Sequence, residues 1–186
     1  MSDAPPIFSD DISIDLNSDE YFMSEALKEA MKAHKMEEVP VGAVIVSDGQ
    51  IIGRGYNQVE TLKDATAHAE MLALTAAQES LGDWRLSECD LFVTKEPCPM
   101  CAGAIVHCRI RDLVYGCSSP KDGAAGGGFI NLLEQPTLNH RTEIRSGVLA
   151  DQSAQILRDF FRSARVKSKR VDDQENQINV WFLCFW

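Results

Sequence analysis

The fold is decided by residues 90–117, which read DLFVTKEPCPMCAGAIVHCRIRDLVYGC. Residues 90–95 predict a strand, and residues 99–110 predict a helix with Pro99 near its first turn, a position that favours proline. Residues 112–117 predict another strand. Strands that alternate with helices along the chain are typical of an α/β layered sheet.

The sequence before this stretch extends the pattern. Residues 41–47 and 51–57 predict two strands joined by Asp48-Gly49, which is a strong hairpin signal. Residues 68–81 predict a buried helix. An earlier helix is expected to begin at Asn17, which resembles a capping box with Glu20 three residues later, and to end before Pro40.

The sequence after it supplies a glycine-rich loop at 118–129, a short strand at 142–147 and an amphipathic helix at 151–170. The helix ends in basic residues, since the segment 158–170 holds six basic residues and one acidic residue. This arrangement indicates one α/β domain without internal repeats.

The chain of 186 residues has the size of one domain with tails. Its net charge of −10 is concentrated at the ends, because residues 1–20 hold six acidic residues and no basic one. We expect an acidic, disordered tail at 1–18, a domain at 19–170, and a tail at 171–186 that ends in VWFLCFW. Because the acidic residues are concentrated at the ends, the net negative charge does not exclude a nucleic-acid partner for the domain.

The cellular location is inferred from what the sequence lacks. No apolar run approaches the roughly 18–20 residues needed to cross a bilayer, and the first residues do not resemble a signal peptide. Six cysteines are too few for a disulfide scaffold. We therefore expect a cytoplasmic protein with no membrane partner, whose reduced thiols are available for metal or redox chemistry.

Two short motifs carry candidate chemistry: His68-Ala69-Glu70 opens one predicted helix, and Cys98 and Cys101 open the next. Cysteines three residues apart lie on one face of a helical turn, whose amino terminus favours thiolates. With His68 they offer two sulfurs and one nitrogen, which leaves the fourth position of a tetrahedral zinc ion open to water, as in catalytic sites. Glu70 is near enough in sequence to move protons there.

Each motif alone has a simpler interpretation. A lone C-x-x-C fits a redox pair or a structural zinc, and a structural site could draw on four other residues: Cys89, His107, Cys108 and Cys117. Those four are typical of ordinary interior or edge positions. The two motifs together, in this order, match the H-x-E…P-C-x-x-C pattern of zinc nucleobase deaminases.

A wider similarity runs from about residue 19 to residue 165. The blocks that carry it are EVPVGAVIV (38–46), TAHAEMLAL (66–74), EPCPMCAGAIVHCRI (96–110), GAAG (123–126), NHRTEI (139–144) and LRDFFRSAR (157–165). In these blocks the chain resembles the bacterial tRNA-specific adenosine deaminases. The resemblance implies a cytidine-deaminase-like, three-layer α/β/α fold with a mixed sheet of about five strands.

The resemblance also implies a reaction. Members of the family are homodimers that act on a tRNA anticodon stem-loop and convert adenosine at the wobble position, in an arginine tRNA, to inosine and ammonia. It implies that His68, Cys98 and Cys101 hold one Zn²⁺ per subunit, that a zinc-bound hydroxide attacks purine C6, and that Glu70 shuttles protons. It further implies that Asn57 contacts the target nucleoside. Bases of an anticodon loop unstack readily and can enter such a site.

Further substrate contacts are expected from the glycine-rich loop and from polar or basic segments: Ser119, Lys121, Asn139, His140, Arg141, Arg162 and Arg165. The alternatives are a solvated helix face for the arginines and loop packing for His140. The chain departs from the family pattern at Ser119, where members usually carry an aspartate expected to face the substrate sugar. It departs again at Lys95, where they usually carry an apolar residue.

Two other functions remain as alternatives. A guanine or nucleoside deaminase would act on small molecules and be indifferent to RNA, but the blocks at 139–144 and 157–165 favour the tRNA enzymes. A non-catalytic, zinc-bearing RNA-binding module would have no use for Glu70 beside an open metal position.

Overall fold

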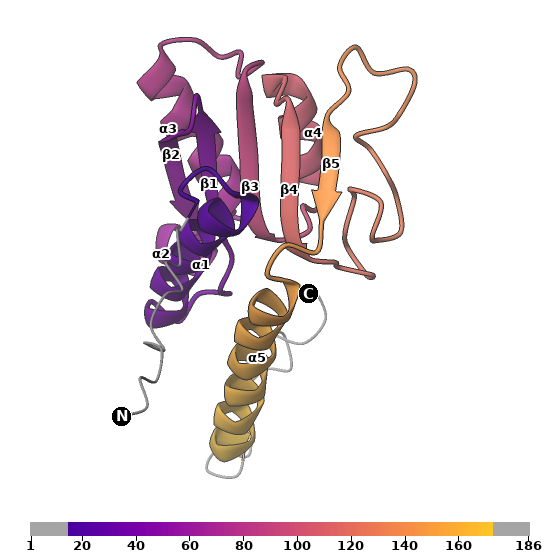
Figure 1. Ribbon diagram of the computed structural model, residues 1–186. Helices are drawn as coiled ribbons and strands as arrows, with labels where there is room; N and C mark the ends of the chain where they lie inside the picture. The colour runs from indigo at the N-terminus through magenta and orange to yellow at the C-terminus, as the bar shows by residue number, and fades with distance from the viewer. Residues whose placement is uncertain (1–14, 173–186) are drawn as a thin grey trace, which may run out of the picture.

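A computed structural model describes residues 15–172, with side chains up to residue 166 (Figure 1). Its centre is a five-stranded sheet with the order β2-β1-β3-β4-β5. The strands are β1 (Gly42–Ser47), β2 (Gln50–Tyr56), β3 (Cys89–Lys95), β4 (Asp112–Cys117) and β5 (Glu143–Ser146). β1 is antiparallel to β2 and β3, whereas β3, β4 and β5 are parallel. The predicted mixed sheet of five strands is confirmed.

Asp48 and Gly49 form the turn between β1 and β2. Both residues have positive φ, 47° and 73°, which is the combination that a two-residue type I′ turn requires. Glycine adopts this conformation without a steric penalty and aspartate tolerates it. The hairpin predicted from these two residues is confirmed.

The described residues form five helices: α1 (Asp19–Lys35), α2 (Val59–Leu62), α3 (Ala69–Leu81), α4 (Pro99–Cys108) and α5 (Ala150–Asp172). The single turn α2 was not expected from the sequence. The expected capping box of Asn17 with Glu20 is wrong, because Ser18 is the N-cap and its Oγ accepts a hydrogen bond from the Tyr21 amide at 3.1 Å. Glu20 is then the second helical residue instead of the third, where a capping box needs it.

The tails lie largely outside the described residues. The structure describes residues 15–172, which include only a few residues of each expected tail. The expected boundaries at 18 and 171 therefore stay predictions. In the described part of the chain, no helix has the length and apolar character that a bilayer crossing requires.

Apolar cores on both faces of the sheet make the fold three-layered. Ile45 of β1 packs into one core with Ile105 of α4 and with α3. Val44, the neighbour of Ile45 on β1, packs into the other core with Phe22 of α1. Successive strand residues point to opposite faces, and burial of each large apolar side chain contributes about 1.5–3 kcal/mol. The predicted α/β/α layering is confirmed.

Two glycines of β2 set the position of α3. A Cβ atom at Gly55 would lie 2.2 Å from the Ala69 carbonyl oxygen, and one at Gly53 would lie 2.5 Å from the Ala73 carbonyl oxygen. The first two turns of α3 therefore rest directly on the backbone of β2. This close approach fixes the amino-terminal end of α3, where the His68 motif lies.

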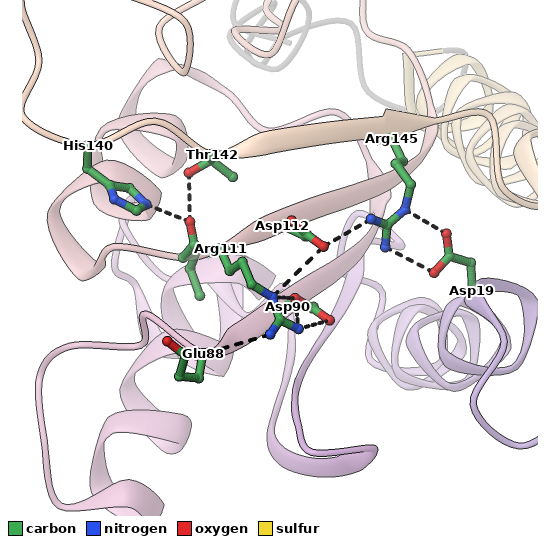
Figure 2. A network of polar contacts seen from close by, with 9 residues as sticks. Asp19, Glu88, Asp90, Arg111, Asp112, His140, Thr142 and Arg145 are labelled. Carbon is green, nitrogen blue, oxygen red and sulfur yellow. Dashed lines mark hydrogen bonds and ion pairs between the residues drawn. The ribbon is translucent and has the colours of Figure 1, made fainter.

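An ion-pair network holds the end of the sheet where β3 and β4 begin (Figure 2). Arg111 binds both carboxylate oxygens of Asp90, at 3.0 and 2.9 Å. Arg145 of β5 joins Asp112 of β4, at 3.0 Å, to Asp19 at the start of α1, at 2.8 Å. The network ties α1 to the edge of the sheet. It lies at the opposite end of the sheet from His68, Cys98 and Cys101.

Candidate active site

The predicted catalytic motifs meet at the other end of the sheet. Lys95 at the end of β3 is paired with Cys117 at the end of β4, and Gly42 at the start of β1 is paired with Tyr56 at the end of β2. The segments that leave these strand ends carry the motifs. Open α/β sheets commonly bind ligands outside the carboxyl ends of their parallel strands.

His68, Cys98 and Cys101 form one cluster, the metal trio. His68 is the N-cap of α3, Cys98 is the N-cap of α4, and Cys101 lies in the first turn of α4. The Nδ1 atom of His68 is 3.6 Å from the Sγ atom of each cysteine. Among the residues that the structure describes, this is the one group of three or more metal-ligating side chains close enough to share an ion.

The separation of the donor atoms fits a tetrahedral zinc ion. With Zn–S near 2.3 Å and Zn–N near 2.0–2.1 Å, a tetrahedral angle places sulfur and nitrogen about 3.5 Å apart. The two observed separations of 3.6 Å agree with this value. Three protein ligands of this kind are the set that catalytic zinc sites use.

The local sequence holds Cys98 in a ligating position. Pro99 is the first residue of α4, where its missing amide hydrogen has no partner to lose. A residue before proline is driven to extended backbone, and Cys98 has φ −72° and ψ 170°. Extended backbone is also what an N-cap needs, so the Pro-Cys-Pro sequence sets the direction from which α4 begins.

Without metal, the trio shares its protons. A hydrogen bond from the Cys101 thiol is the main cause that lowers the pKa of Cys98 to about 4, against its burial. The same contact and burial raise the pKa of Cys101, and the contact with Cys98 raises the pKa of His68. Thiolate and neutral imidazole are the ligating forms, so metal binding displaces the protons that these groups still carry.

Glu70 lies beside the trio in the first turn of α3. The residue is 4% exposed, and burial is the main cause that raises the pKa of its carboxyl group. The charge of Glu70 and a side-chain hydrogen bond both act on the pKa of Cys101, which locates its carboxyl group against the metal trio. A buried carboxyl group with a raised pKa is typical of a general acid–base residue.

Asn57 follows β2 and is 3% exposed. Its Nδ2 atom donates to Glu38 at 3.2 Å, and the Glu38 carboxylate also accepts from the amides of Glu60 and Thr61. Glu38 thereby fixes which way the Asn57 amide faces. Sequence reasoning missed Glu38, whose partners lie 19 to 23 residues away along the chain.

Glu96 is a second buried acid that the sequence did not reveal. It is 1% exposed, and its Oε1 atom accepts from the amides of Ala125, Gly127 and Gly128 at 2.9–3.0 Å. Its Oε2 atom accepts from the Ser119 amide at 2.8 Å. The carboxylate holds the glycine-rich loop beside Cys98. The run of glycines was the available signal, since a backbone that wraps an acceptor needs residues without side chains.

The structure also locates the other expected substrate contacts. Ser119 is buried at the start of the glycine-rich loop, and Lys121 is exposed on it. Arg162 and Arg165 are exposed on α5, and Arg162 forms an ion pair with Asp159 at 3.5 Å. These residues lie on segments that leave the carboxyl ends of β4 and β5.

The segment from Asn139 to Arg141 is not brought to the metal trio. His140 Nε2 donates to the Ile110 carbonyl at 2.7 Å, and the Asn139 carbonyl accepts from Arg109 at 3.5 Å. These partners follow the last turn of α4 and precede β4. The segment therefore lies at the opposite end of α4 from Cys98, and the loop-packing alternative for His140 has a specific contact.

The known proteins that this chain is similar to are deaminases. The profile of the MafB19-like deaminases matches residues 17–165. A tRNA-specific adenosine deaminase of Bacillus subtilis strain 168 is 47% identical over 154 residues, which are 83% of this chain and 95% of the relative. A tRNA-specific adenosine deaminase of Agrobacterium fabrum is 48% identical over 153 residues, which are 82% of this chain and 97% of the relative.

Two solved structures share the fold. One comes from studies of A-to-I editing by tRNA:A34 deaminases at the wobble position of transfer RNA. It has a TM-score of 0.71 at 47% identity, over 74% of this chain and 99% of that chain. The other, a guanine deaminase from Nitrosomonas europaea, has a TM-score of 0.65 at 26% identity, over 86% of this chain and 97% of that chain.

Proposed function

Because the chain belongs to the MafB19-like deaminase family and to the tRNA-specific adenosine deaminases, we propose that it deaminates adenosine at the wobble position of a tRNA anticodon. The reaction is a hydrolysis in which water replaces the 6-amino group of the purine, so that inosine forms and ammonia leaves. We take an arginine tRNA as the substrate, presented as its anticodon stem-loop.

We propose that the metal is Zn²⁺, one ion in each subunit, held by His68, Cys98 and Cys101. Two soft sulfur donors and one imidazole favour zinc over hard cations such as magnesium. Zinc in this site would supply Lewis acidity, which lowers the pKa of water towards about 7. The separation of 3.6 Å between sulfur and nitrogen supports this assignment.

Glu70 is the residue that moves protons. Its carboxylate takes a proton from the attacking water and delivers it to N1 of the purine. It then takes the second proton from the hydroxyl now bonded to C6 and passes it to the departing amine, so that the C6 carbonyl of inosine forms as ammonia leaves. A group that must accept and then donate works best with a pKa near the operating pH, and burial raises the pKa of Glu70 in that direction. The buried Glu70 beside the metal trio is the observation that carries the proposal.

Binding of the RNA divides into contacts to the nucleoside and contacts to the backbone. Asn57, oriented by Glu38, is proposed to bind the target base, and Ser119 its sugar region. Lys121, Arg162 and Arg165 are proposed to bind phosphates along the stem-loop; since they are exposed, their contribution is electrostatic and weakens with salt. Asn139, His140 and Arg141 lie at the far end of α4 from the metal trio, so we propose them as contacts to the RNA backbone away from the target nucleoside.

We propose a homodimer formed through the outer face of α4. Val106 and His107 of α4, together with Leu132 and Leu138, line a hollow of about 390 Å³, and Leu138 is 40% exposed. A second copy would cover this apolar surface in the symmetric manner usual for homodimers. Asn139 also lines the hollow, so in such a dimer its segment would adjoin the partner.

We place the enzyme in the cytoplasm. The five cysteines of the described residues are free thiols, and two of them serve as metal ligands only while reduced. A reducing compartment keeps them so.

Guanine deamination is the second candidate, because the guanine deaminase structure shares the fold over 86% of this chain. A substrate panel separates the two. Zinc-loaded protein is incubated with an anticodon stem-loop that carries adenosine at the wobble position, with free adenosine and with guanine. We expect inosine in the stem-loop and no turnover of the small molecules. Release of ammonia from guanine, with the stem-loop unchanged, would overturn the tRNA assignment.

A further inference from the structure

The apolar face of α5 is packed against the body of the protein over only part of its length. Four apolar residues at helical spacing lie on one side of α5: Leu157, Phe160, Phe161 and Ala164. Leu157 packs against the core of the sheet, and the ring of Phe160 lies 6.0 Å from the ring of His34 of α1. Phe161 is 36% exposed, and Ala164 is also exposed. We call this exposed part of the face, Phe161 with Ala164, the open face.

The direction of α5 explains why its second half is left exposed. The first turns of α5 lie on the sheet, since a Cβ atom at Gly116 of β4 would be only 2.4 Å from Oγ of Ser153. From there α5 extends away from the sheet (Figure 1), and every residue from 161 to 166 is exposed. α5 ends at Asp172, and a helical stretch as short as 161–172 is marginally stable in water when nothing packs on it. Apolar cover on the open face would therefore stabilise this half of the helix.

The basic residues of α5 lie on a different side. Arg158, Arg162 and Arg165 follow one another at steps of four and three residues, so they form one stripe along the helix. At 3.6 residues per turn this stripe is roughly 120° away from the apolar face. A segment that covers the open face would leave the arginine stripe free.

The chain itself contains a segment that matches the open face. Residues 173–186 lie outside the described residues, and the last seven, VWFLCFW at 180–186, are all apolar and include four aromatic residues. We call 180–186 the aromatic segment. A run of this kind needs cover in a protein that stays in water. The seven residues that connect it to α5, DQENQIN, are polar except for one isoleucine.

The connection is long enough for the aromatic segment to return along α5. Asp172 and Phe161 are 11 residues apart on the helix, which corresponds to a rise of about 16 Å. The seven connecting residues span up to about 23 Å when they are extended. A tether of this length gives an effective concentration on the order of millimolar, so the segment reaches the open face of its own chain more readily than that of another copy.

We propose that the aromatic segment folds back and packs on the open face of α5 in the same chain. Each aromatic ring can bury about 150–250 Å², so a few rings suffice to cover Phe161 and Ala164. The docked segment keeps the second half of α5 helical and leaves Arg162 and Arg165 facing solvent. Its value for RNA binding rests on the proposed function, whereas the docking itself does not.

Tryptophan fluorescence reports on the aromatic segment. The chain has three tryptophans, and Trp84→Phe, a change at a half-exposed position after α3, leaves only Trp181 and Trp186. In this background we expect emission at shorter wavelength and slower quenching by acrylamide than for the same protein unfolded in urea. Both signals measure whether the aromatic segment is covered.

A charge on the open face tests where the segment packs. Ala164→Asp places a carboxylate in the proposed contact, and the ratio of docked to undocked segment should fall about tenfold or more. The emission should then shift to longer wavelength, and quenching should approach that of the unfolded protein. Val166→Asp is the matched control, because Val166 is 47% exposed and lies on nearly the opposite side of α5. This variant should keep the fluorescence of its parent.

Amide hydrogen exchange tests the contact from the other partner and leaves α5 unaltered. The change is Phe182→Ser together with Phe185→Ser in the otherwise native full chain. Loss of docking should speed exchange of the amides at 161–166 about tenfold or more, while the amides at 153–160, which lie against the sheet, keep their rates. This measurement separates loss of docking from a direct effect of aspartate on the helix.

The outcomes distinguish this proposal from its competitors. Tryptophans that are quenched in the native protein as fast as in urea would overturn it. Protected tryptophans that Ala164→Asp leaves protected, or exchange rates that the serine variant leaves unchanged, would show that the segment packs elsewhere. Protection that disappears on dilution would assign the segment to another copy of the chain. Because no RNA is used, a failure to form inosine would overturn the proposed function and leave the docking intact.

Discussion

Replacement of Glu96 by glutamine tests whether one buried carboxylate holds the loop of the active site. Glutamine has the same shape, but only one of its two terminal atoms accepts hydrogen bonds. The orientation that loses least keeps the oxygen at the position of Oε1, where three loop amides converge. The new amide group then faces the amide of Ser119, which donates to Oε2 at 2.8 Å in the native protein.

The magnitude follows from these contacts. One hydrogen bond to a charged acceptor, worth about 1.5–3 kcal/mol, is lost, and a buried donor is left without a partner. We expect Glu96→Gln to lower the free energy of unfolding by about 3 kcal/mol. For a chain of this length a loss of 1 kcal/mol lowers Tm by about 2–4 °C, so the expected fall is about 6–12 °C.

The measurements are thermal melting of the zinc-loaded protein and kcat and KM on the anticodon stem-loop. KM should rise more than kcat falls, because the affected bond ends at Ser119 and not at Glu70. Glu88→Gln is the matched control, since the Glu88 side chain is 83% exposed and surface substitutions usually change stability by less than about 0.5 kcal/mol. Equal melting temperatures for the two variants would show that the Glu96 carboxylate does not hold the loop.

Three further predictions use other parts of the structure. Zinc binding to the metal-free protein at pH 7 should release protons, above all from Cys101, whose pKa is raised; calorimetry in buffers of different ionisation enthalpy measures their number, and a binding heat independent of the buffer contradicts this prediction. Glu25→Gln should destabilise the protein at neutral pH, because the contact with Lys28 and that with Arg54 lower the pKa of Glu25 against burial. A carboxyl group whose pKa is lower in the folded than in the unfolded protein stabilises the fold at pH values above the unfolded pKa, and this stabilisation is lost as pH falls through the folded pKa. Denaturation curves of the variant and wild type should therefore converge below pH 4.5. A constant difference in stability at acid pH would speak against this role of ionised Glu25. Gly55→Ala should push α3 away from β2, since the new Cβ would lie 2.2 Å from the Ala69 carbonyl oxygen; we expect a loss of about 1–3 kcal/mol in stability and weaker zinc binding in a chelator competition, and unchanged zinc affinity would show that His68 does not depend on this packing.

The cluster of His68, Cys98 and Cys101 could be predicted from the sequence because most of it is built from short-range spacing. His68 and Glu70 are two residues apart, Cys98 and Cys101 are three apart, and each pair opens a helix. Only the approach of α3 to α4 is long-range, and the family resemblance supplied it. The Asp48-Gly49 hairpin was equally local, because two residues with positive φ determine it.

The supporting residues could not be predicted in this way. Glu96 binds amides 23 to 32 residues away, and Glu38 reaches Asn57 across 19 residues, so no spacing along the chain marks either residue. Buried acids are rare, so a glutamate in a sequence is assigned to the surface by default. Only the three-dimensional structure shows the hydrogen-bond donors that allow these two to be buried. The same limit applies to Asp122, whose partner Lys95 is 27 residues away.

The capping error at the start of α1 has a different origin. Asn17 and Ser18 are both good N-cap residues, and propensity alone does not choose between neighbours. The helix begins after Ser18, whose Oγ accepts from the Tyr21 amide. Asn17 instead faces the hairpin, where its Oδ1 atom would lie 2.7 Å from a Cβ atom at Gly49.

Glu70 is proposed to move the protons of a wobble-adenosine hydrolysis at this metal site. The most direct test is inosine formation in the anticodon stem-loop by wild type and Glu70→Gln, measured under single-turnover conditions at equal zinc content. We expect inosine from the wild type and a loss of about 10²–10⁴-fold in the rate of the variant, with the melting temperature retained. A Glu70→Gln variant that forms inosine at the wild-type rate would show that Glu70 does not move these protons.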